Sequence, residues 1–208
     1  MSLWTDRVVP HLADASLKTP EVMELRARVC PGLYGKVLEI GFGSGLNVTC
    51  YPDEVTSVSA VEPSDVGWRL SEKRRSACST PVHRSGLDGQ RLTEPDGSHD
   101  AALSTFSLCT IPDPGRALAE VRRVIAPGAA LHFLEHGLAP DAGVRQWQRR
   151  LEPMQRRLAG GCHLSRDIPG LVREAGFEIE TLEKVYAPGP RMSRPWSYVY
   201  FGVARAPR

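Results

Sequence analysis

The sequence has no run of apolar residues approaching the 18 or so that a membrane-spanning helix needs, although its hydrophobic content of 41% is ordinary. We therefore expect no integral membrane segment. The amino terminus, MSLWTDRVVPHLADAS, also lacks the long apolar stretch of a signal peptide. These absences favour a cytoplasmic protein.

The chain also lacks a strong charge of either sign, and it has no CxxC pair. Its formal net charge is only +2. A nucleic-acid-binding surface needs a strong positive charge, so we expect no nucleic-acid partner. The five cysteines are an odd, scattered set that fits reduced thiols better than a disulfide framework. Cys162 has only His163 beside it, and adjacent residues point in different directions, so we expect no metal site.

Apolar runs alternate with segments of helical spacing in the first two thirds of the chain. We expect strands at 36–41, 55–62, 81–86, 99–106 and 129–136. Pro63-Ser64-Asp65 offers an N-cap for one helix, and Asp113 or Pro114 opens another that Pro127-Gly128 would stop. Strands alternating with helices imply an α/β fold with a mostly parallel sheet covered on both faces.

The pattern changes after residue 136. We expect an amphipathic helix broken or kinked at Pro153, a short helix capped by Ser165, and two antiparallel strands within 177–187 and 197–206. A chain of 208 residues is long enough for one core. The sequence thus predicts a single domain, with amino-terminal helices in 1–35, a central core in 36–136, and helices and a terminal hairpin in 137–208.

Three glycines alternate directly after the first predicted strand, at Gly41, Gly43 and Gly45. A glycine loop between a strand and a following helix lets the backbone approach a ligand closely. The dinucleotide fingerprint GxGxxG would need a third glycine at position 46, which is Leu46. An NAD(P)-dependent oxidoreductase is therefore the weaker alternative. With Glu39 in register, the stretch resembles the first motif of the class I S-adenosylmethionine-dependent methyltransferases.

Three further segments continue this resemblance. Glu62 and Pro63 end the second strand about 20 residues after the loop, where a carboxylate can accept both ribose hydroxyls; the alternative for Glu62 is a strand-end residue or helix cap. Asp88 matches the position that contacts the adenine amino group, or else is a turn residue. The stretch DAALSTFSLCTIPDP resembles the fourth motif, which passes beneath the methionine portion. The cofactor-binding residues implied are Glu39, Gly41, Gly43, Gly45, Asn47, Glu62, Pro63, Leu87, Asp88, Ser104, Thr105 and Phe106.

Residues 34–204 resemble the methyltransferase-like seven family of thiol S-methyltransferases. The segments that carry this resemblance include FLEHG, LEPMQRRLAGGCHLSRD and RPWSYVYFGVA. The resemblance implies a doubly wound seven-stranded sheet with an antiparallel last strand, S-adenosylmethionine as cofactor, and methyl transfer to a small apolar acceptor such as a thiol. A quinone, phenol or phospholipid-amine acceptor is the alternative, and a non-catalytic module that binds the nucleoside cofactor is a rival of another class.

His136, just past the fifth strand, is the candidate catalytic residue. A histidine there could face the cofactor methyl group and raise the thiolate fraction of an acceptor whose pKa is near 8.5. Alternatively it hydrogen-bonds a neighbouring loop and orders the pocket wall. The arginines of the helix after strand five form a face that is solvated or that touches anionic lipid headgroups. The oligomeric state is not readable from the sequence.

Overall fold

The computed structural model describes residues 3–208 and contains one seven-stranded sheet. The strands are β1 (Gly35–Ile40), β2 (Val55–Val61), β3 (Val82–Gly86), β4 (His99–Thr105), β5 (Ile125–His136), β6 (Glu178–Tyr186) and β7 (Tyr198–Arg205). The α-helices are α1 (Val9–Leu17), α2 (Pro20–Val29), α3 (Asp65–Leu70), α4 (Glu72–Ala77), α5 (Pro114–Val124), α6 (Ala142–Leu158), α7 (Ile168–Glu174) and α8 (Arg194–Ser197). Three shorter helical segments are η1 (Trp4–Val8), η2 (Leu46–Cys50) and η3 (Arg191–Ser193).

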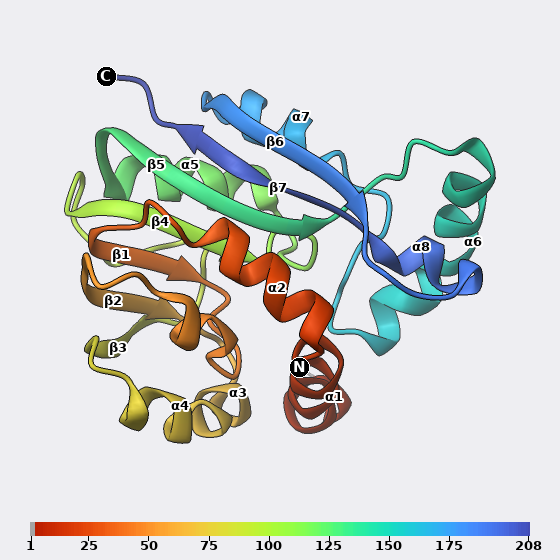
Figure 1. The fold of residues 1–208 in the computed structure, drawn as a ribbon, viewed down its shortest axis with the longest axis horizontal. Helices are drawn as coiled ribbons and strands as arrows, with labels where there is room; N and C mark the ends of the chain where they lie inside the picture. Colours follow the sequence, from red (N-terminus) through yellow and green to blue (C-terminus); the bar gives the residue numbers. More distant parts are fainter. Residues whose placement is uncertain (1–2) are drawn as a thin grey trace.

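The strand order is β3-β2-β1-β4-β5-β7-β6. Neighbouring strands from β3 to β5 are parallel, and β7 runs antiparallel to both β5 and β6. In Figure 1 the arrowheads of β1 and β5 point to the same side, and that of β7 points the opposite way. The predicted mostly parallel sheet with an antiparallel last strand is confirmed.

Successive residues of the strands pack against helices on opposite faces of the sheet. Val37 of β1 lies in an apolar cluster with Leu25 and Val29 of α2. Its neighbour Leu38 lies in a second cluster with Leu118 of α5. Figure 1 shows α2 crossing one face while α5 and α7 lie behind the sheet. Because strand side chains alternate, a strand buried on both faces needs apolar residues at consecutive positions, and the sequence has them.

The expected helix directly after the glycine loop is wrong. The chain forms only the short 3-10 segment η2 there, and Tyr51 already has an extended backbone with φ −66° and ψ 129°. The cause is Pro52, because a proline disfavours helical backbone in the residue that precedes it. The chain therefore turns toward β2 after little more than one helical turn.

The boundary between α5 and β5 also differs from the prediction. The helix ends at Val124, and β5 begins at Ile125. The expected stop at Pro127-Gly128 falls inside β5, at an irregularity in its pairing with β4. His99 pairs with Ile125, but Ala101 pairs with Ala130, so the intervening residues of β5 bulge. A bulge accommodates a proline because that residue need not donate to the ladder.

In the last third of the chain, the predicted cap of the short helix is wrong. Asp167, rather than Ser165, caps α7, and its carboxylate accepts from the Gly170 amide at 3.1 Å. The Ser165 hydroxyl instead donates to Glu152 on α6. The helix α6 continues through Pro153 without a break. The predicted antiparallel pairing of β6 with β7 is confirmed.

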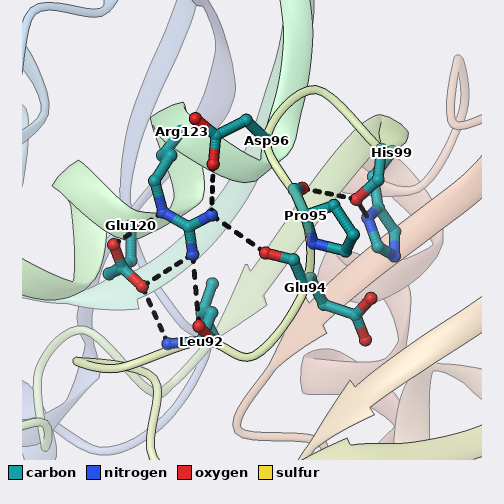
Figure 2. Close-up of polar contacts among 8 residues, drawn as sticks. Leu92, Glu94, Pro95, Asp96, His99, Glu120 and Arg123 are labelled. Atoms are coloured by element: carbon teal, nitrogen blue, oxygen red, sulfur yellow. Dashed lines mark hydrogen bonds and ion pairs between the residues drawn. The ribbon is translucent and has the colours of Figure 1, made fainter.

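The long connection between β3 and β4 is fastened to α5 by one arginine. The Arg123 guanidinium donates to both carboxylate oxygens of Glu120, to Asp96, and to the backbone carbonyls of Leu92 and Glu94. Figure 2 shows these contacts converging on the guanidinium. The bidentate pair with Glu120 orients the guanidinium, and its three bonds to Leu92, Glu94 and Asp96 hold the loop more firmly than one isolated surface ion pair would.

The close approach of the paired strands β6 and β7 predicts a sensitive position at Gly202. A Cβ there would lie 2.0 Å from the Thr181 carbonyl oxygen, so the two strands would have to separate. We expect Gly202→Ala to lower the free energy of unfolding by about 1–3 kcal/mol, measured by urea denaturation. The matched control is Gly143→Ala in α6, where no heavy atom lies within 4 Å of the added carbon. Equal stability of the two variants would contradict the clash.

Candidate functional site

The glycine loop leaves β1 at the edge where the parallel strands end. Gly41, Gly43 and Gly45 have φ values of 70°, 58° and 74°, which non-glycine residues rarely adopt. At Gly41 a Cβ would collide with the Ser107 hydroxyl, and at Gly45 it would press on the Phe42 ring. At Gly43 the same position meets only the Gly41 carbonyl oxygen, at 3.9 Å. The middle glycine therefore faces open space, and the outer two are needed for packing.

Glu62 lies at the end of β2 and holds the glycine loop. Its carboxylate accepts from the Gly43 amide at 2.6 Å and from the Ser64 amide at 2.7 Å. Only 5% of the residue is exposed, and burial raises its pKa. Pro63, between these contacts, is exposed. The structure therefore brings Glu62 and Gly43, two of the predicted cofactor-binding residues, into direct contact.

A buried polar network joins Glu39 to β4. The Asn47 amide donates to the Glu39 carboxylate and to the Thr105 hydroxyl, each at 2.9 Å. Arg26 of α2 donates to Asn47 and to Thr105, each at 2.7 Å, and the Tyr51 hydroxyl donates to Glu39. Burial raises the pKa of Glu39 to about 7, although these donors and the Arg26 charge oppose the shift. The network fixes the start of η2 against the end of β4.

A second buried carboxylate, Glu135 of β5, orders the turn after β4. Its oxygens accept from the Ser104 hydroxyl and from the amides of Ser107, Leu108 and Cys109, at 2.8–3.1 Å. Four donors satisfy an acceptor that burial would otherwise make costly. Ser104 therefore lies beneath this turn, with its hydroxyl on Glu135.

Phe106 and His136 meet at this edge. Among the described residues, Phe106 is the one non-glycine residue with positive φ, at 54°. Its ring centroid lies 5.0 Å from that of His136 in an edge-on arrangement. Bulky residues with left-handed backbone are uncommon and tend to occur at functional sites. The structure thus holds an aromatic wall against the candidate catalytic histidine.

Leu87 and Asp88 lie on the connection after β3, and both are exposed. Asp88 accepts from the backbone and side-chain amides of Gln90, at 2.9 and 3.0 Å, and these bonds lower its pKa. A Cβ on Gly89 would lie 3.0 Å from Ile40, the last residue of β1. This connection therefore passes the same edge of the sheet as the glycine loop.

Comparisons with known proteins agree with this arrangement. Residues 38–133 match the methyltransferase domain family. The chain is 32% identical to human thiol S-methyltransferase TMT1B over 76% of its length, and 30% identical to human thiol S-methyltransferase TMT1A over 79% of its length and 69% of the relative. The chain belongs to the class I S-adenosylmethionine-dependent methyltransferases. The chain spans 62%, 66% and 69% of the length of three curated relatives that it matches.

A solved structure with the same fold is a S-adenosylmethionine-dependent methyltransferase from Thermotoga maritima. It is 21% identical, with a TM-score of 0.71, and the match covers 99% of this chain and 100% of that chain. At this identity the likeness concerns the fold alone. Within residues 3–208, the methyltransferase has no helix that is both long and apolar enough to cross a bilayer.

The methyl donor of the family is S-adenosylmethionine, and the residues at this edge fit it. The open position above Gly43 gives the room that a close-lying nucleoside requires. A carboxylate has about four acceptor positions, and the two backbone donors on Glu62 use only two of them. Glu62 can therefore accept from ribose hydroxyls while it holds the loop.

The sequence analysis missed Arg26, which is buried and central to the Glu39 network. Its signal in the sequence is weak: Arg26 stands beside Leu25 and three residues before Val29, on the face of α2 that is otherwise apolar. A cation on such a face indicates a buried acidic or carbonyl partner. The partners are 21 and 79 residues away, so no local pattern identifies them.

The raised pKa of Glu39 predicts a pH-dependent stability. Between about 4.5, its ordinary value, and about 7, the folded protein binds the proton more tightly than the unfolded chain. The free energy of unfolding should therefore fall by up to about 3 kcal/mol as the pH rises through this range. This change is measured by chemical denaturation of wild type and Glu39→Gln at pH 5 and pH 8. The glutamine side chain of the variant cannot ionise, so the variant lacks this contribution.

The decisive quantity is the pH-dependent part of the stability difference between wild type and Glu39→Gln. It should favour the variant more at the higher pH. Glu54→Gln, an exposed position before β2, is the matched control and should show no such trend. A constant difference between wild type and Glu39→Gln would contradict the assignment.

Proposed function

We propose that the methyltransferase transfers the methyl group of S-adenosylmethionine to the sulfur of a small apolar thiol. The observation that carries this proposal is the placement of His136, half-buried against Phe106 at the carboxyl end of β5. Ligands of open α/β sheets bind beyond this edge. The names of the two human relatives, both thiol S-methyltransferases, support a sulfur acceptor.

The positions of the predicted site residues along the carboxyl edge of the sheet support one orientation of the bound donor. Gly43 and Glu62 suit the nucleoside, and Asp88 is the proposed adenine contact on the connection beyond. Thr105 ends β4 and Phe106 follows it, on the other side of β1. The methionine portion would then extend toward β4 and β5, with the activated carbon near His136.

The chemistry demands little of the protein beyond alignment. The bound donor supplies a methyl carbon activated by a positively charged sulfur. The acceptor sulfur must approach in line with that bond, and correct orientation alone contributes a large part of such a rate enhancement. Because a free thiol has a pKa near 8.5, part of it is thiolate at neutral pH. In this proposal His136 increases that fraction at the reacting position.

The first test concerns the donor. Gly43→Ala fills the open position above the loop, so we expect weaker binding of S-adenosylmethionine by about 10- to 100-fold in titration calorimetry. The matched control is Gly97→Ala. Gly97 has a φ of 60°, close to the 58° of Gly43, and its Cβ position is also open. Both substitutions impose the same backbone strain, so unchanged affinity in Gly43→Ala would contradict the proposed donor site.

The second test concerns the acceptor. The protein is incubated with methyl-labelled donor and a panel of thiols, quinols, phenols and amines, and the labelled products are identified. We expect label on apolar thiols. His136→Ala should lower turnover while the donor affinity stays unchanged, and His11→Ala in α1 is the control. Label that appears on quinols, phenols or amines but not on thiols would overturn the proposed acceptor. An equal loss of donor affinity in His136→Ala would overturn the role of the histidine.

A further inference from the structure

Three side chains with soft ligand atoms meet beside the proposed acceptor position. The Cys162 sulfur lies 3.9 Å from the Cys109 sulfur and 3.8 Å from His136 Nδ1. All three ligand atoms lie within 4.8 Å of one another. The premise that only His163 approaches Cys162 is therefore wrong, because Cys109 and His136 come from distant parts of the chain.

The three residues belong to three different segments that the backbone ties together. Cys109 lies in the turn after β4, where its amide donates to Glu135 and its carbonyl accepts from the His163 amide at 2.8 Å. Arg166 donates to the carbonyls of Leu108 and Ile111 in the same turn. The segment that carries Cys162 is thus bonded to the turn that carries Cys109. Both cysteines are buried, and His136 is half-buried.

The spacing of the ligand atoms matches a tetrahedral zinc ion. Zinc bonds of about 2.3 Å to sulfur and about 2.0 Å to nitrogen place two tetrahedral ligands about 3.6–3.8 Å apart. The sulfur–sulfur separation of 3.9 Å and the separation of 3.8 Å between Cys162 Sγ and His136 Nδ1 are close to these values. Two thiolates and one imidazole form a donor set that favours zinc over hard cations such as magnesium. Three protein ligands leave the fourth position of the tetrahedron open, as in catalytic zinc sites.

We propose that Cys109, His136 and Cys162 bind a zinc ion whose open fourth position receives the thiol acceptor. The ion-binding part stands on the three side chains alone, and the acceptor part rests on the proposed function. In this site His136 increases the thiolate fraction of the acceptor indirectly, because its imidazole binds the ion and the ion binds the acceptor sulfur.

The step balances without a further reagent. The acceptor thiol loses its proton to solvent when its sulfur binds the ion, as metal binding to a thiol requires. The acceptor sulfur then forms a bond to the methyl carbon. The bond from that carbon to the donor sulfur breaks, and its electron pair stays on the donor sulfur. The product thioether is a weaker ligand than the thiolate, and it leaves the ion.

Zinc binding is measured with the full chain and Zn²⁺ alone, in competition with a chromophoric chelator and with a phosphine reductant present. We expect one equivalent to bind. Cys162→Ser and His136→Ala should each weaken the affinity by more than about 100-fold. Cys78→Ser is the matched control, because Cys78 is a half-buried cysteine that contacts the Val48 carbonyl instead. Zinc affinity equal to that of wild type in both Cys162→Ser and His136→Ala would overturn the site.

The absorption spectrum of the cobalt-loaded wild-type protein tests the site without any variant, so it does not depend on whether a variant folds. Wild-type protein with Co²⁺ should show thiolate-to-cobalt charge-transfer absorption and the strong visible bands of a tetrahedral ion. An apolar thiol should change these bands, whereas a phenol of similar size should not. A wild-type spectrum without charge transfer would overturn the proposal.

Two outcomes separate this inference from the proposed function. If chelator-treated, zinc-free protein methylates thiols as fast as zinc-loaded protein, the zinc proposal fails and the proposed function stands. If one zinc binds through the three residues while no thiol is methylated, the metal site stands and the proposed acceptor fails.

Discussion

The burial of the Glu39 carboxylate is the constraint on which the candidate site depends. Only 1% of this residue is exposed, so its oxygens must find their hydrogen-bond donors inside the protein. Asn47 and Tyr51 are these donors, the charge of Arg26 adds to them, and each of the three comes from a different segment. Losing one of these partners would leave a buried polar group unsatisfied at a cost of about 1–3 kcal/mol. The glycine loop is therefore held between β1, β4 and α2 by one set of polar contacts.

Two further buried carboxylates also accept hydrogen bonds from neighbouring loops along the same edge of the sheet. Glu62 accepts from the loop after β1, and Glu135 accepts from the turn after β4. In both cases backbone amides point at a side chain that a neighbouring strand supplies. Parallel strands bring their ends together at one edge, so each carboxylate can reach the loop beside it. Loop geometry at the site is thus set by strand pairing rather than by the loops' own propensities.

The sequence predicted the parts of this arrangement that depend on local pattern. The limits of β1 and β2 agree within one residue, because their apolar runs are bounded by turn residues. The start of β5 was missed because a bulge hides the pairing around Pro127, and η2 was missed because Pro52 limits it. The cysteine pair is 53 residues apart in the chain. Contacts of that kind depend on tertiary packing, which no spacing rule encodes.

The unusual backbone of Phe106 follows from the burial of Glu135. The Phe106 amide donates to the Leu134 carbonyl, and the next three amides donate to the Glu135 carboxylate, so the chain curls tightly around the end of β5. Such a curl needs a left-handed residue, which costs about 1–2 kcal/mol for a non-glycine residue. A glycine would avoid that cost, but it would remove the ring that packs on His136. The same curl carries Cys109 toward His136, so the strain at Phe106 and the three-residue cluster have one origin.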